Sequence, residues 1–255
     1  MALFRNDSPI GMQPGGDYAI ASNPVSTITM NSVMRLVYVW MFLGLAVSAF
    51  VAFFVSNQIE TALATGANSI WLSPVVLFGS VIATFVLAIV LGIGLTRKWL
   101  SPTLAAGLFM LYAALMGVML SSVLVVYADA TIFKAFGSTA ILFGIMSVYG
   151  YTTKSDLTSM GKYLMMGLIG LIVASLVNLF LGSSGLDYII SIIGVLIFVG
   201  MTAYDTQKIK RMAENPAIQN DSNMVLKVSI YGALELYLDF INLFLFLLRL
   251  FGRND

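Results

Sequence analysis

The sequence has 255 residues, of which 59% are hydrophobic and 10% charged, and its formal net charge is +1. A soluble domain carries about 25% charged residues, so this composition predicts an integral membrane protein and excludes a polybasic nucleic-acid-binding surface. The chain contains no cysteine and no histidine, which excludes disulfides, thiolate or imidazole metal sites, cysteine nucleophiles and a Ser-His-Asp triad.

Residues 1–33 are polar and rich in Gly, Pro, Ser and Asn, which predicts a flexible cytoplasmic tail before a transmembrane domain at 34–255. A helix needs about 20 apolar residues to cross a bilayer. By this criterion the sequence predicts six spanning helices and a seventh apolar segment that also carries acidic residues. The helices are expected at 35–56, 72–95, 102–127, 132–151, 162–182, 187–206 and 228–251. The expected fold class is therefore an all-α membrane-embedded bundle.

The basic residues lie unequally on the two sides of this arrangement. On the side of the N-terminal tail they are Arg5, Arg35, Arg97, Lys98, Lys154, Lys162, Lys208, Lys210, Arg211 and Lys227. The opposite loops hold Lys134, so the positive-inside rule predicts a cytoplasmic N-terminus. Arg249 and Arg253 lie outside if the last segment spans fully and inside if it re-enters. Its apolar length favours a full span, whereas the charge count favours re-entry.

Small residues recur four apart in two of the predicted helices, at Gly44-x-x-x-Ser48 and Gly170-x-x-x-Ala174. This spacing lets helix backbones approach closely. Tight packing within one chain is favoured over a dimerisation face.

The last predicted helix contains acidic residues in the part that would lie within the hydrocarbon core of the bilayer. Glu235, Asp239 and Asn242 are spaced i, i+4 and i+7, so they form one polar stripe. Asp239 lies about eleven residues into the helix, roughly 16 Å from its start. Since lipid offers a carboxylate no partner, the stripe is expected to face the bundle interior or water. The alternative for Asp239 is a structural hydrogen bond between helices, and Glu235 and Asn242 are expected to support the site.

A second acid, Asp205, lies near the cytoplasmic end of the helix predicted at 187–206. The two last helices run antiparallel, so Asp205 and Asp239 can face each other. Two carboxyls in a poorly hydrated site titrate as a coupled pair and can share a proton, which makes them the best candidate pH sensor. Arg97 could bond to Asp205. Alternatively, Arg97 snorkels to the interface, and Asp205 is an interfacial acid that balances nearby lysines.

Three stretches resemble the Bax inhibitor-1 family, also called the transmembrane Bax inhibitor motif family. They are FVGMTAYDTQKIK, GALELYLDFINLFLFLLRLFG and YGYTTKSDL, and the similarity runs from Arg35 to Gly252. The resemblance, nearest to bacterial inner-membrane members, implies a seven-helix bundle whose last helix is enclosed by the others. It also implies a pH-sensitive Ca²⁺ leak. We expect no cofactor and no enzymatic activity.

The resemblance further implies roles for individual residues. Asp205 of the YD motif and Asp239 of the LYLDF motif would form the pH-sensing pair, and Arg97 would be a latch on Asp205. Glu235 departs from the family pattern, in which that position is often uncharged. Bacterial relatives are also linked to a membrane-anchored AAA+ protease, which is a second candidate partner besides lipid, protons and Ca²⁺.

The leading hypothesis is thus a proton-gated cation pathway, most favourably for Ca²⁺, which prefers hard oxygen ligands. Asp205, Asp239, Glu235 and Asn242 could bind the ion transiently, without a fixed metal site. The main alternative is an interaction protein that modulates a membrane-bound protease, in which the acids are purely structural. A remote alternative is an intramembrane aspartyl protease. That chemistry needs Gly-x-Gly before the second aspartate, whereas the bulky residues 236–238 precede Asp239.

Overall fold

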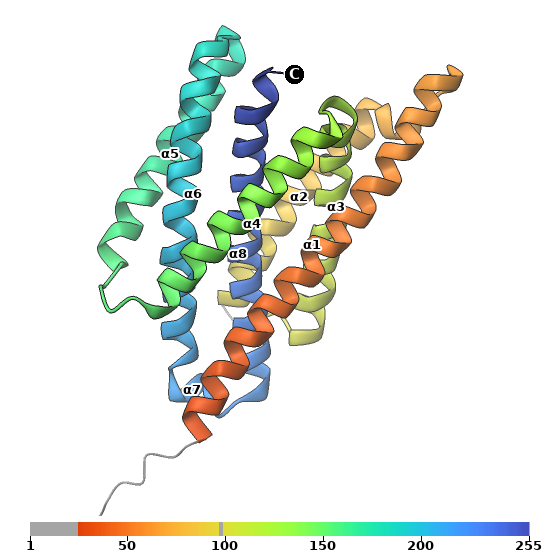
Figure 1. Cartoon of the computed structure of the whole chain (residues 1–255). Coiled ribbons are helices and arrows are strands. Elements are labelled where there is room, and N and C mark those ends of the chain that lie inside the picture. The colour runs from red at the N-terminus through yellow and green to blue at the C-terminus, as the bar shows by residue number, and fades with distance from the viewer. Residues whose placement is uncertain (1–24, 97–98, 255) are drawn as a thin grey trace, which may run out of the picture.

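The computed structural model describes residues 25–96 and 99–254, which contain helices and no strand (Figure 1). The long helices are α1 (Val25–Thr65), α2 (Pro74–Thr96), α3 (Pro102–Val126), α4 (Asp129–Thr152), α5 (Thr158–Leu181), α6 (Ser184–Ala213) and α8 (Ser222–Phe251). Three short elements complete the described chain: η1 (Ile70–Leu72), α7 (Pro216–Gln219) and η2 (Gly252–Asn254). The prediction of an all-α membrane protein is confirmed.

Six of the long helices, α1 to α6, are long and apolar enough to cross a membrane. The remaining one, α8, combines an apolar sequence with Glu235, Asp239 and Arg249. Each of the seven predicted segments therefore overlaps one long helix.

The structure differs most from the predicted bounds at both ends of α1 and at the facing ends of α6 and α8: α1 ends at Thr65 instead of near residue 56, and α8 begins at Ser222 instead of near residue 228. Helix α1 begins at Val25, inside the segment expected to be a tail, whereas residues 1–24 lie outside the described residues. Helix α6 continues to Ala213 instead of ending near residue 206. The polar residues after Asp205 include no Gly or Pro before Pro216, so nothing in the backbone interrupts the helix.

Capping residues explain where the two C-terminal long helices begin. The Ser183 side chain accepts a hydrogen bond from the Leu186 backbone N–H at the start of α6. The Asp221 carboxylate accepts hydrogen bonds from two backbone N–H groups at the start of α8. Both residue types are strong N-caps because their oxygens satisfy donors that have no partner within the helix. The short α7 and its loop thus return the chain antiparallel to α6.

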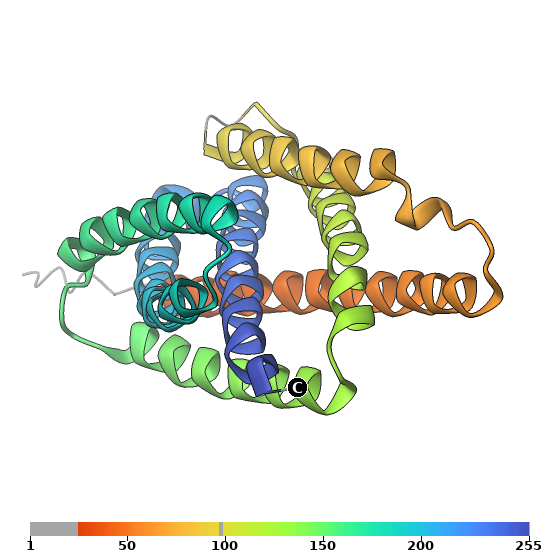
Figure 2. The same cartoon turned by 90° about the horizontal axis from the view of Figure 1, so that it is seen from above.

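Helix α8 contacts α1, α2, α3, α4, α6 and α7. Its fully buried side chains include Leu236, Tyr237 and Leu243. Viewed from above, α2 and α5 lie at the outside of the arrangement, and α5 packs against α6 (Figure 2). Buried side chains therefore occur along much of the length of α8.

The two small-residue motifs have different surroundings. A Cβ atom on Gly44 would lie 2.8 Å from the Phe109 ring, and the Ser48 hydroxyl donates to the Ala113 carbonyl oxygen over 2.7 Å. This motif packs α1 against α3 within the chain, as predicted. Gly170 has no neighbour within 4 Å of a Cβ position, so the expectation of tight packing is wrong there.

Candidate functional site: a buried carboxyl pair between α6 and α8

Helices α6 and α8 pack against each other and bring Asp205 and Asp239 together. Asp205 is 4% exposed and Asp239 is 3% exposed. Their carboxyl groups are close enough to interact electrostatically. Because a hydrogen bond between two carboxyl groups needs a proton on one of them, this geometry suits a pair that shares a proton.

Lys208 supplies a positive charge beside these acids. Its Nζ atom lies 2.5 Å from Glu235 Oε1 and 3.6 Å from Asp205 Oδ1. The same atom donates a hydrogen bond to the Tyr231 hydroxyl over 3.2 Å. The ammonium therefore bridges α6 and α8 and neutralises part of the acidic charge between them.

No sequence pattern predicts Lys208 as a site residue, because the apolar part of its helix ends near residue 206. In a continuous helix, residues three apart lie on the same face, and Lys208 is three residues after Asp205. The Lys208 side chain is 32% exposed and that of Glu235 is 18% exposed. The ion pair thus lies between the buried Asp pair and the surface.

Two carboxyl oxygens in this cluster accept no hydrogen bond within the described part of the chain. They are Oδ2 of Asp239 and Oε2 of Glu235, and both are buried. A buried acceptor without a partner is costly, and more so when it is charged. Each oxygen is consequently a favourable point for a proton or a cation.

Hydroxyl groups continue the polar region from α6 towards α1. Thr206 Oγ1 lies 3.1 Å from Ser147 Oγ, which lies 2.8 Å from the Tyr38 hydroxyl. The three residues belong to α6, α4 and α1 and connect those helices through hydrogen bonds. Isolated Ser, Thr and Tyr residues gave no signal in the sequence, since these types are common in membrane helices as hydrogen-bonding residues.

The structure does not group Asn242 with the acids. Its Nδ2 atom donates to the Leu238 carbonyl oxygen of the same helix over 2.8 Å. The side chain lines a groove with residues of α5 and α6, including Phe198. Arg97, the predicted latch, lies outside the described residues. Its expected bond to Asp205 therefore stays a prediction, and Lys208 is the cation that the structure places beside that acid.

A hydrogen-bond network fixes the α4–α5 loop to the end of α6 beyond the acids. The Gln207 side chain accepts from the Leu157 backbone N–H over 2.9 Å and donates to the Ser155 carbonyl oxygen over 2.8 Å. Arg211 donates to Asp156 over 2.7 Å. Hydrogen bonds from Thr158, together with the nearby Arg211 guanidinium, lower the pKa of Asp156 to about 2. The polar end of α6 is thus anchored by the loop before α5.

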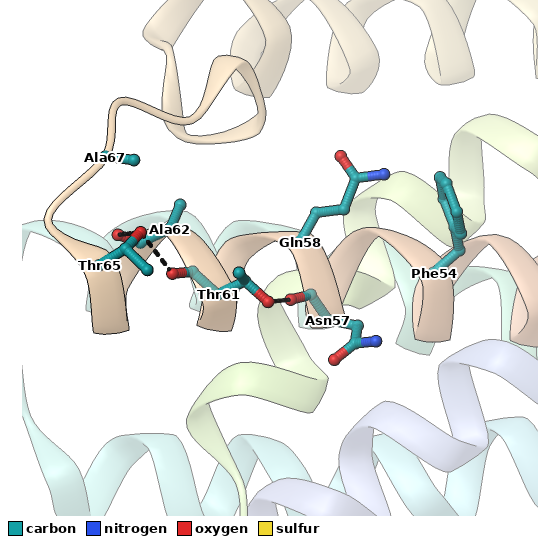
Figure 3. A pocket seen from close by; sticks show the side chains of 7 residues that line it. All are labelled: Phe54, Asn57, Gln58, Thr61, Ala62, Thr65 and Ala67. Atoms are coloured by element: carbon teal, nitrogen blue, oxygen red, sulfur yellow. Dashed lines mark hydrogen bonds between the residues drawn. The ribbon is translucent and has the colours of Figure 1, made fainter.

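A separate hollow of about 360 Å³ lies at the C-terminal end of α1 (Figure 3). Two of its hydroxyls are satisfied within the helix, where Thr61 donates to the Asn57 carbonyl and Thr65 to the Thr61 carbonyl. No ionisable residue lines it. Of these two sites, the α6–α8 cluster is the one whose residues can bind a proton or a cation.

No group of three or more Asp, Glu, His or Cys residues in the described parts of the chain has the geometry of a metal site. Cation binding at the α6–α8 cluster would therefore use fewer carboxylates at one time, with other oxygens or water completing the shell.

The fold and the site define a multi-pass helical membrane protein with a carboxyl pair buried between its last two long helices. Residues 30–255 match the family described as "Inhibitor of apoptosis-promoting Bax1". The chain is 48% identical to the inner membrane protein YbhL of Escherichia coli K12 over 225 residues, covering 88% of this chain and 93% of that relative. It is 45% identical to a protein of Borreliella burgdorferi, over 88% of this chain and 94% of that relative. An uncharacterized membrane protein of Streptococcus pyogenes serotype M3 is 39% identical, covering 90% and 96%. The chain belongs to the Bax inhibitor family.

Proposed function

We propose that this protein is a pH-sensitive cation leak in a bacterial inner membrane, with Ca²⁺ as its principal permeant ion. In this proposal α8 is a seventh spanning helix enclosed by the others, and the N-terminus is cytoplasmic. The excess of Lys and Arg on the side of the α6–α8 turn supports this orientation. The similarity to an inner membrane protein supports the location.

The observation that carries the proposal is the pairing of Asp205 and Asp239 within the bundle. With one shared proton, the pair holds α6 and α8 together through a hydrogen bond. After that proton leaves, two neighbouring carboxylates repel each other in a medium that solvates them poorly. The repulsion is relieved if the helices separate or if a cation enters. Loss of a proton and entry of a cation are thereby coupled at one site.

The positive charge of Lys208 would lower the net negative charge of the site for an entering cation. While its ammonium is bound to Glu235 and lies 3.6 Å from Asp205, it competes with a mobile cation for the same oxygens. A divalent ion competes better than a monovalent one, because its attraction to each carboxylate is about twice as large at equal distance. This competition supports Ca²⁺ over Na⁺ or K⁺.

The test is cation flux through the purified full-length protein in proteoliposomes, measured against pH with Ca²⁺, Na⁺ and K⁺ compared. Asp239→Asn and Asp205→Asn should each flatten the pH dependence of Ca²⁺ flux, because an amide cannot share a titrating proton. Asp129→Asn is the control, since Asp129 is an exposed acid in the first turn of α4. An unchanged pH profile in both α6 and α8 variants would contradict the proposal.

The same experiment separates the alternative roles. Flux absent from the wild type, together with protease co-purification that survives both aspartate substitutions, would favour a modulator of a membrane-anchored protease. An enzyme is not part of the proposal. Leu236 and Tyr237 are fully buried beside Asp239, so a substrate strand would have no room to approach that carboxyl.

A further inference from the structure

Two arginines lie at the end of the bundle opposite the α6–α8 turn, where α8 ends and α6 begins. The Arg249 guanidinium lies 5.4 Å from the centre of the Phe246 ring. The Arg253 guanidinium lies 4.8 Å from the centre of the Tyr188 ring. Neither arginine forms an ion pair or hydrogen bond with another residue that the structure describes. Arg211, at the other end, is bonded to Asp156 over 2.7 Å.

Stacking on a ring leaves the edge of a guanidinium free to donate hydrogen bonds, and each guanidinium has five N–H donors. Arg249 and Arg253 together border a cavity of about 170 Å³, which also contains the hydroxyl-bearing side chains Ser184 and Tyr188. The cavity therefore presents two planar groups that match the geometry of phosphate oxygens.

This cavity continues into an apolar groove. Arg249 and Asp187 also border a second hollow of about 370 Å³, which reaches Ser175 and Leu179 on α5. Ser175 and Leu179 in turn border a third hollow of about 300 Å³ between α5, α6 and α8. The lining changes along this path from charged, through hydroxyl and amide groups, to aliphatic and aromatic side chains.

The dimensions of the apolar part fit one leaflet of a bilayer. On α5 it runs from Leu168 to Leu179, which is roughly 16 Å at 1.5 Å per residue. Half of the hydrocarbon core of a bilayer is about 15 Å. Leu176 and Leu179 are exposed on this face, so the groove opens to the surroundings of the bundle, where acyl chains are present.

The charge at the polar end selects among lipids. The lining holds the two guanidiniums of Arg249 and Arg253 against the single carboxylate of Asp187, so its net charge is positive. The net positive charge complements a headgroup with net negative charge better than a zwitterionic one. Asp187 can accept hydrogen bonds from hydroxyl groups of such a headgroup.

We propose that Arg249, Arg253 and the adjoining groove between α5, α6 and α8 form a binding site for an anionic phospholipid. The two guanidiniums hold the phosphate, and one acyl chain lies along the groove. The two arginines lie at the end of the bundle where α8 ends, ten or more residues along α8 from Asp239, and the site does not depend on cation conduction.

Native mass spectrometry of the full-length protein in a mild detergent tests this site, with phosphatidylglycerol and phosphatidylethanolamine titrated separately. The wild type should bind phosphatidylglycerol more tightly than phosphatidylethanolamine. The double variant Arg249→Gln/Arg253→Gln should weaken phosphatidylglycerol binding about tenfold or more, the equivalent of one lost charge-assisted hydrogen bond. Arg211→Gln is the matched control and should bind like the wild type.

Two further arms keep the result interpretable. Ser175→Trp should weaken lipid binding by filling the groove while leaving both arginines in place. If the double variant does not fold, the single variant Arg253→Gln should also weaken phosphatidylglycerol binding. Glycerol 3-phosphate, which has the phosphate without a chain, should compete poorly. Equal binding of the two lipids by the wild type, unchanged binding by the arginine variants, or competition by glycerol 3-phosphate at lipid-like concentrations would each overturn the proposal.

Discussion

Helices α5 and α8 are both rich in apolar residues, yet they occupy opposite environments. In α5 the buried residues are Gly161 and Leu171, and most of its large side chains face outwards. In α8 the buried residues include Asp239 together with aromatic and aliphatic side chains from most of its turns. The more uniformly apolar helix is the more exposed one, and the helix that carries acids is the more buried one.

The difference follows from what surrounds a membrane protein. Lipid tails are as apolar as leucine, so a helix such as α5 gains little by leaving lipid for protein. A carboxyl group in hydrocarbon is costly, so α8 is stabilised only where other helices supply partners. High hydropathy therefore indicates that a helix can enter a membrane, whereas acidic residues within an apolar helix indicate which face packs against other helices.

Removing one tyrosine from each helix should give the largest contrast. Tyr237 of α8 is fully buried, lies 2.6 Å from the Ser48 hydroxyl and packs edge-on against Phe109. Tyr237→Ala should lower the free energy of unfolding by about 3–5 kcal/mol, through a cavity and a lost hydrogen bond. Tyr163 of α5 is 74% exposed, and Tyr163→Ala should change it by less than about 0.5 kcal/mol. Denaturant titration in mixed micelles measures both, and similar losses would break the comparison.

Adding one methyl group should have opposite signs at two glycines. A Cβ atom on Gly194 of α6 would lie 2.7 Å from the Phe246 ring of α8, so Gly194→Ala should cost about 1–3 kcal/mol through overpacking. Gly170 of α5 has no neighbour within 4 Å, and Gly170→Ala should stabilise the helix by roughly 0.5–1 kcal/mol. The same titration checks this pair. A loss at Gly170 would show that α5 is packed against another molecule.

A smaller effect is expected where the start of α5 is attached to α6. Gln207→Ala removes the two hydrogen bonds to the backbone of Ser155 and Leu157 and should cost about 1–2 kcal/mol. Because those bonds hold the loop before α5, we expect faster proteolysis at 153–157 with little change in α8. Limited proteolysis in detergent measures this, and Gln219→Ala serves as a control within the adjoining α7. Equal protection of the loop in both variants would contradict the assignment.

The smallest effect concerns Asp156, whose pKa is lowered from 3.8 to about 2. A carboxyl group with a lowered pKa stabilises the fold above its unfolded-state pKa, and this contribution disappears as pH falls through the folded-state value. The stability difference between the wild type and Asp156→Asn should thus be constant above about pH 5 and shrink towards about pH 2. Thermal unfolding across that range measures it. A difference that grows on acidification would contradict the sign.

Much of this arrangement could be predicted from sequence. Runs of about 20 apolar residues located the long helices, because length and hydropathy are fixed by the bilayer. The meeting of Asp205 and Asp239 followed from an antiparallel pair of helices joined by a short turn. Lys208 was missed because the helix carrying Asp205 extends farther than its apolar part. Gly170 was misjudged because spacing alone does not reveal whether another helix lies opposite.

Gly150 of α4 has a consequence for how the acids could separate. A Cβ atom there would collide with the backbone of Ala203, so α4 and α6 touch main chain to main chain two residues before Asp205. Such a contact leaves no room for α6 to come closer to α4. A side chain at residue 150, even one as small as that of alanine, would therefore push α4 and α6 apart next to Asp205, which makes Gly150 a position where the spacing around the acids is set by the backbone alone.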